Sequence, residues 1–412
     1  MKSFFRASLA LLALFAFCGV VRSQSYESLV QKETVSIVKI NLDQIDSQSL
    51  AKSIQKIGNG AVDYFLPGND ENATQFKQLV PIAGMFVSQA YSTNVEPLKE
   101  AGVKELYVVV DQAKDENEKL YPYVAVPVEG LQKEQKDEIR NALQGFNKML
   151  PQDSQYTLKY RFERSGFIFN LIVPSELSQD DVKAYMKSRF QKIATVEATN
   201  FVDGFKAAPA KAALSGVNLK VDNDELAQKQ IDDAFAQIEE NADADALKMF
   251  KDSIGSLVNL NEELSQKVKY NYWWVDLQAL EVVSVIQANS NDDAKEYVDV
   301  VQSKLVAELN SMFDKLASSV ADSEDSSVTD DQKELAKKAV EQAKPVVAAF
   351  MTCSVDGSKV VWKINEKFWT DNKPVFDEFV RFIREEVLAK MKTDDVDNDE
   401  DDDEGDIEFD AL

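Results

Sequence analysis

The stretch "VKYNYWWVDLQALEVVSVIQA", residues 268–288, decides how this chain folds. Its two runs are rich in aromatic and β-branched residues and are separated only by the link "QAL", which is typical of two antiparallel strands. Because neighbouring side chains of a strand point to opposite faces, Tyr270, Tyr272 and Trp274 share one face. The sequence therefore predicts a sheet with an unusually aromatic strand.

Two interpretations of this aromatic row are open at this stage. If helices cover the sheet, the row is buried core, because buried aromatic side chains contribute strongly to stability. If the face stays in contact with solvent, Tyr270, Tyr272 and Trp274 form a candidate ligand face for a glycan or a peptide. The many amphipathic helix patterns of the chain favour the first interpretation.

The same order of elements, two strands and then a helix, occurs twice in each half of the chain. In the first half we expect strands at 103–111, 120–128, 157–163 and 167–173, a helix at 131–150, and a helix to Ile193 that Ser178 caps, because Ser178 and Asp181 resemble a capping box. In the second half we expect strands at 268–277, 281–288, 351–355 and 359–365, and helices that begin near Asn291, as the cap, and near Asn372. A further strand at 33–42 and helices at 48–57 and 73–92 precede the first set. The strand starts 103 and 268 differ by 165 residues, which indicates an internal repeat.

These patterns predict an α+β fold of two related modules. Each module consists of antiparallel β-strand pairs that alternate with amphipathic helices, and the helices cover the sheet. The expected ranges are a signal peptide at 1–23, a first module at 24–200, a second module at 201–392 with a helical insertion near 320–350, and a disordered acidic tail at 393–412.

The N-terminus predicts export from the cytoplasm. Lys2 and Arg6 precede the apolar run "ASLALLALFAFCGVV", and "VRS" offers small residues for cleavage before Gln24. We therefore expect a secreted or periplasmic protein with no membrane span in the mature chain. Loss of the signal peptide leaves Cys353 as the single cysteine, so no internal disulfide is expected.

Composition excludes several kinds of site. The chain has no histidine, which excludes catalytic triads and histidine-based zinc, copper or iron sites. Its formal charge is −25, and such a chain should repel nucleic acid and anionic lipid. No catalytic residue, cofactor or metal ligand is predicted, although carboxylate chemistry stays open because the chain has 71 acidic residues.

The acidic tail, "TDDVDNDEDDDEGDIEFDAL" (393–412), is the strongest compositional feature. Its composition is typical of a disordered solubilising segment, and weak, unspecific binding of divalent cations is expected. A third interpretation is a docking peptide, since Ile407, Phe409 and Leu412 are apolar positions among acids and suit an added β-strand.

Two stretches resemble uncharacterised exported bacterial proteins with repeated α+β modules. One is "LKEAGVKELYVVVDQ" with the following "YPYVAVPVEGLQKEQKDEI", and the other is "YNYWWVDLQALEVVSVIQANSNDDAKEYVDVV". The resemblance implies export and a repeated architecture. It implies no activity and no functional residues.

The expected function is therefore that of an exported, non-enzymatic binding or scaffolding protein of the cell envelope or the extracellular space, with an unknown protein or glycan partner. The alternative is a carboxylate-based enzyme acting on glycans, or a carbohydrate-binding protein.

Overall fold

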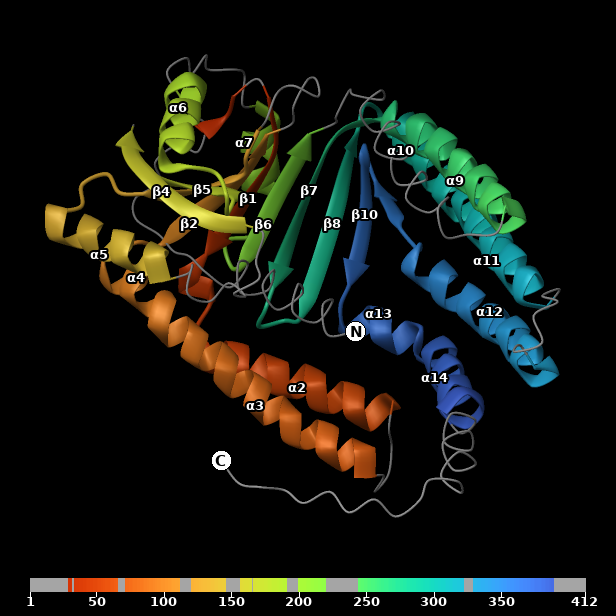
Figure 1. Cartoon of the computed structure of the whole chain (residues 1–412). Helices are drawn as coiled ribbons and strands as arrows, with labels where there is room; N and C mark the ends of the chain where they lie inside the picture. The colour runs from red at the N-terminus through yellow and green to blue at the C-terminus, as the bar shows by residue number, and fades with distance from the viewer. Residues whose placement is uncertain are drawn as a thin grey trace.

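The structure of the chain is a computed structural model, drawn in Figure 1. It describes residues 29–31, 33–65, 71–111, 120–145, 156–164, 166–190, 199–219, 244–321 and 329–388. The predicted signal peptide and the predicted acidic tail lie outside these residues.

One antiparallel sheet of ten strands forms the framework (Figure 1). The strands are β1 (Thr34–Asn41), β2 (Glu105–Asp111), β3 (Tyr123–Pro127), β4 (Tyr156–Arg164), β5 (Phe167–Pro174), β6 (Leu214–Leu219), β7 (Val268–Asp276), β8 (Glu281–Ala288), β9 (Ser354–Asp356) and β10 (Lys359–Ile364). They follow one another across the sheet in the order β4-β5-β3-β2-β1-β6-β7-β8-β10-β9. The predicted α+β fold with antiparallel strand pairs is confirmed.

The internal repeat is visible in the strand order. Outward from the centre, the first half runs β1-β2-β3-β5-β4 and the second half runs β6-β7-β8-β10-β9, which is the same order. At the centre, β1 pairs antiparallel with β6, with Val38 opposite Gly216. Because equivalent strands pair antiparallel there, an approximate two-fold rotation relates the two halves. The last residues of β2 and β7, Asp111 and Asp276, are again 165 residues apart.

The two modules share one continuous sheet through the β1–β6 pair. The boundary predicted between residues 200 and 201 falls inside α7 (Thr199–Ala207), which packs on β6 and β7. By its contacts α7 therefore belongs with the second module. The helical insertion predicted near 320–350 corresponds to α12 (Asp330–Phe350).

The helices lie between the strands in sequence and cover both faces of the sheet (Figure 1). Those not yet given are α2 (Ser47–Phe65), α3 (Glu71–Asn94), α4 (Glu96–Glu100), α5 (Lys133–Gly145), α6 (Gln179–Phe190), α9 (Ala244–Ser265), α10 (Asn291–Asp299), α11 (Val306–Ala321), α13 (Glu366–Asp371) and α14 (Lys373–Phe382). A π-helical segment, Val300–Leu305, joins α10 to α11, so the long helix predicted from residue 291 is confirmed.

Three clusters of buried residues form the core. On one face, Leu98 of α4 and Ile139 of α5 pack over the strands of the first half. Further along the same face, α9 and α10 pack over β8 and β10. On the opposite face, Val182 of α6 packs at the outer strands of the first half, and Phe201 of α7 packs over β6 and β7. The sheet is therefore covered from both sides.

Two helix starts test the capping predictions. Ser178 Oγ accepts the backbone N–H of Asp181 at 3.1 Å, so the predicted cap of α6 is confirmed. The predicted cap of α10 is wrong: Ser290, not Asn291, accepts the N–H of Asp293, at 3.0 Å. Both serine and asparagine are good capping residues, and the choice depends on where the preceding strand ends.

A glycine of β6 makes room for a tryptophan of β7. Gly216 lies opposite Trp273, and a Cβ atom on Gly216 would be 2.5 Å from Cε2 of the indole. No side chain larger than hydrogen fits there. Glycine weakens a strand on its own, so we infer that packing of the indole over the backbone offsets this cost at the centre of the sheet.

Replacement of Gly216 by alanine is expected to lower the free energy of unfolding by about 2 kcal/mol, because the new methyl group overlaps the Trp273 ring. Urea unfolding measures the change. The matched control is Gly255→Ala in α9, where a Cβ meets nothing within 4 Å, and which should stabilise the protein by about 0.5–1 kcal/mol. Adding Trp273→Leu to Gly216→Ala should recover part of the loss, and an unchanged Gly216→Ala protein would contradict this account of the contact.

Candidate functional site

The aromatic row of β7 lies in the core of the structure. Tyr270 is 7% exposed and Tyr272 is 4% exposed, and both belong to the cluster that contains Phe201. Tyr272 and Trp274 are stacked, with ring centroids 6.1 Å apart. Burial raises the pKa of both tyrosines above the usual value. Tyr270 and Tyr272 are therefore core residues, and Trp274 is half-buried at the margin of the same cluster.

The other conspicuous aromatic group also packs on itself. Trp369, 48% exposed, contacts Phe350, Phe368 and Phe376 where α12, α13 and α14 meet. Trp362 meets Tyr297 edge to face, with centroids 6.0 Å apart. Trp369 is therefore an exposed aromatic side chain, and Trp362 is partly buried against the core.

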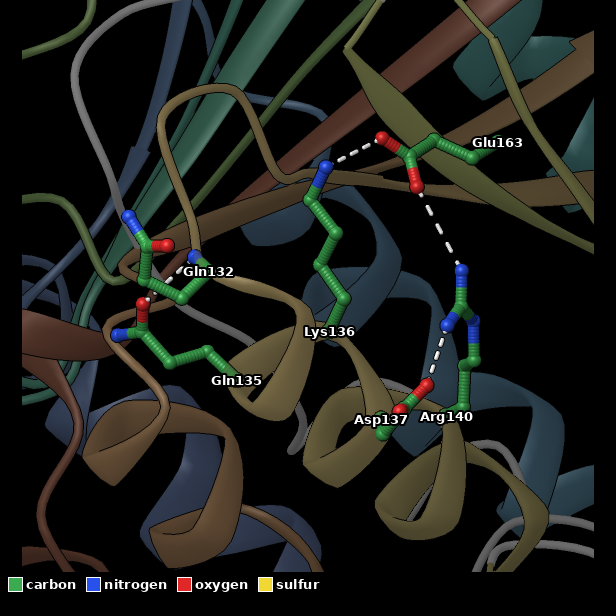
Figure 2. A network of polar contacts seen from close by, with 6 residues as sticks. All are labelled: Gln132, Gln135, Lys136, Asp137, Arg140 and Glu163. Atoms are coloured by element: carbon green, nitrogen blue, oxygen red, sulfur yellow. Dashed lines mark hydrogen bonds and ion pairs between the residues drawn. The ribbon is translucent and has the colours of Figure 1, made fainter.

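Charged side chains gather where α5 crosses β4, as Figure 2 shows. Lys136 Nζ lies 2.5 Å from one oxygen of Glu163, and Arg140 lies 3.5 Å from the other oxygen and also pairs with Asp137. At the start of the helix, the Gln132 N–H donates to the Gln135 side chain. The acids and bases neutralise one another here, so the network fixes α5 to the sheet and offers no unpaired acid or base for catalysis.

A buried aspartate holds the turn between β7 and β8. Oδ1 of Asp276 accepts the N–H groups of Gln278 and Ala279, at 3.0 and 2.9 Å, and Oδ2 lies 2.6 Å from Lys211 Nζ. Leu280 in this turn has φ of 51°, a conformation that L-residues rarely adopt. Burial alone would raise the pKa of Asp276, but the bonds from Lys211 and the two N–H groups outweigh it and lower that pKa.

The lone cysteine of the described residues is not a nucleophile. Cys353 is 8% exposed, and burial raises the pKa of its thiol to about 11. The thiolate is therefore scarce at neutral pH. Among the described residues, no three acidic or cysteine side chains are arranged to hold a metal ion.

The most unusual surface of the described chain lies on α3. Four large apolar side chains are exposed there: Leu79 by 54%, Ile82 by 42%, Met85 by 61% and Phe86 by 59%. Residues 79, 82 and 86 follow one another at helical spacing and so lie along one side of the helix. We call this set of four residues the outer face of α3.

The opposite side of α3 is occupied. Gly58 of α2 approaches Val80 so closely that a Cβ on the glycine would lie 2.7 Å from the valine side chain. At the base of the hairpin, buried Tyr91 donates its hydroxyl to the Ile45 carbonyl at 2.8 Å, and Lys99 donates to the same hydroxyl at 3.1 Å. Figure 1 shows the resulting pair of helices extending away from the sheet. The hairpin is thus anchored by its inner face, which leaves the outer face to solvent.

An open groove lies between α2 and α3 beside the outer face, and Met85 is the outer-face residue that lines it. Its lining combines the apolar Pro81 and Met85 with the polar Gln55, Ser88 and Gln89. Hydrogen-bonding groups next to exposed apolar side chains are the usual composition of a protein-binding surface.

The hairpin also differs from the rest of the chain in charge. Residues 47–62 and 72–95 contain three lysines, Lys52, Lys56 and Lys77, and no acid. Asp63, Asp70 and Glu71 lie between these two stretches, so residues 47–95 carry three lysines and three acids and are formally neutral, whereas the whole chain has 71 acids and 46 bases. The hairpin is therefore formally neutral in a protein that is strongly negative.

The other predicted docking residues, Ile407, Phe409 and Leu412, lie outside the described residues. Within the part of the chain that the structure describes, no helix combines the length and the apolar character that crossing a bilayer requires. Comparison with protein-family models, curated proteins and solved structures finds no match. The resemblance to exported bacterial proteins stays a prediction.

Replacement of Asp276 by asparagine tests the turn. The amide oxygen can still accept both N–H groups, so only the pairing with Lys211 is lost, and because Lys211 is mostly exposed we expect a loss of about 1 kcal/mol at pH 7. The folded-state pKa of Asp276 lies below 3.8, so its stabilisation is present above that pH and is lost as the pH falls below it. Unfolding curves of the two proteins should converge in acid; a constant difference would contradict the ion pair.

Asn170 in β5 is the second test of an interior polar group. It is 1% exposed, and among the described side chains and backbone groups neither atom of its amide has a hydrogen-bond partner. An orphan buried amide destabilises a protein, so Asn170→Val should raise the free energy of unfolding by about 1 kcal/mol. The matched control is Asn271→Val, which removes the acceptor of the Asn218 amide at 2.8 Å and should destabilise. A destabilised Asn170→Val protein would contradict this prediction and would show that the amide forms stabilising interactions in the folded chain.

Proposed function

We propose that this chain is an exported, non-enzymatic binding protein, and that it holds a protein partner on the outer face of α3. The observation that supports this most is the row of four large apolar side chains exposed along a helix whose other side is already packed. A water-soluble chain rarely leaves such a row uncovered unless something binds to it.

The chemistry of the surface favours a protein over the other candidates. The described charged groups around α5 and the β7–β8 turn are paired, which supports a role other than catalysis. The buried position of Tyr270 and Tyr272 removes the strongest argument for a glycan platform. Anionic membranes are disfavoured, because the chain as a whole has a charge of −25.

The same surface suggests what the partner looks like. An apolar segment would cover Leu79, Ile82 and Phe86, and acidic residues beside it would meet the lysines of the hairpin. The polar side chains of the groove would bond to the backbone of the bound segment. We therefore propose an acidic partner segment with a few large apolar anchors.

The test compares three immobilised forms of the full chain: wild type, Leu79→Gln with Phe86→Gln, and Leu316→Gln as control. Leu316 of α11 is 53% exposed and Leu79 is 54% exposed, so the control removes an equally exposed leucine elsewhere. A partner is captured from envelope or culture-medium extract, purified, and its affinity measured by calorimetry. We expect the double variant to bind at least about tenfold more weakly and the control to bind normally.

Equal affinity of the three forms for the purified partner would contradict the proposal. Capture that soluble oligosaccharides abolish would favour the carbohydrate-binding alternative. Flotation of wild type but not of the double variant with lipid vesicles would assign the outer face to a membrane surface.

A further inference from the structure

The partner proposed for the outer face of α3 is an acidic segment with apolar anchors, and this chain itself contains a segment of that composition. We propose that the acidic C-terminal tail, residues 394–412, covers the outer face of α3 in the free protein. The inference rests on the proposed function in one respect: the tail occupies the surface that the partner uses, and so regulates access to it.

Charge complementarity is the first argument. Twelve acids lie between Asp394 and Asp410, with no basic residue among them. The hairpin stretches 47–62 and 72–95 have only lysines as charged residues, and Lys52, Lys56 and Lys77 are exposed. With Asp63, Asp70 and Glu71 included, residues 47–95 are formally neutral, while the chain as a whole has a charge of −25. The hairpin therefore repels the acidic tail less than the rest of the surface does, and its three lysines are local attraction points.

Apolar complementarity is the second argument. Ile407, Phe409 and Leu412 are the large apolar residues at the end of the tail. These three side chains are of the same chemical kind as the four exposed apolar side chains of α3. Charge brings the tail to the hairpin, and burial of these side chains would hold it there.

Reach is the third argument. The last described residue is Leu388, so 24 residues separate it from Leu412. An extended chain of that length spans up to about 80 Å, roughly twice the length of a 24-residue helix such as α3. In Figure 1, α14 and the α2–α3 hairpin lie beyond the same end of the central strands. A tethered tail is also present at a high effective concentration, which favours a chain's own tail over that of a second copy.

Carbodiimide, which joins lysine to a carboxylate only when they touch, tests the contact directly in the full chain. We expect crosslinks from Lys52, Lys56 and Lys77 to acids of residues 394–410. Lys295 of α10, with a side chain 66% exposed, is the control lysine and should give few. Mixing isotope-labelled and unlabelled protein should show that the crosslinks form within one chain.

A variant with serine at Ile407, Phe409 and Leu412 keeps every acid and removes the anchors. We expect its crosslinks to the hairpin lysines to fall severalfold. Deletion of residues 394–412 should raise the affinity for the purified partner by about tenfold, because the deletion removes a tethered competitor. Three results would overturn the proposal. They are crosslinks to Lys295 as frequent as those to the hairpin lysines, crosslinks that join labelled to unlabelled chains, and crosslinks that persist after the three anchors are replaced by serine. If the deletion leaves partner affinity unchanged while Leu79→Gln with Phe86→Gln still abolishes it, the tail contact fails and the binding function stands.

Discussion

The backbone ladder between β1 and β6 is the constraint on which the rest of the structure depends. It joins the innermost strands of the two modules, residue by residue from Ser36 opposite Asn218 to Ile40 opposite Leu214. Without the other module, β1 or β6 would be an unpaired edge strand of its own half. An exposed hydrophobic edge strand promotes aggregation. The pairing turns two five-stranded halves into one sheet, so the modules stabilise each other.

The details of this junction show how the ladder is kept in register. Ser36 Oγ donates to Asn218 at 2.5 Å, and Asn218 donates to Asn271 at 2.8 Å, so a row of polar side chains crosses β1, β6 and β7. Beside it, the Trp273 ring lies over Gly216. A shift by one residue would bring the ring against a side chain and break the polar row. The rigid sheet in turn gives the α2–α3 hairpin a fixed base, through Tyr91 and its bond to Ile45.

Local patterns in the sequence were sufficient to predict most strands, but they did not predict β6 at the centre of the sheet. Alternating residues such as Leu158, Tyr160 and Phe162 identify a strand by themselves. The stretch "LSGVNL" of β6 has a glycine and few β-branched residues, and it becomes a strand only because β1 and β7 lie on either side. The outer face of α3 was missed for a similar reason: helical spacing shows that a residue faces sideways but not whether a neighbour covers it. The absence of acids from 72–95 was the available signal.

Hydrogen exchange of the full chain, followed by mass spectrometry, tests the central claim that the two modules form one sheet through β1 and β6. The account predicts that amides of residues 36–40 and 214–218 exchange together, at the slowest rate of the protein, because they open only when the whole sheet unfolds. Rapid exchange of these central amides, with separate and slower exchange in the outer strands of each half, would show two independent units and contradict the account.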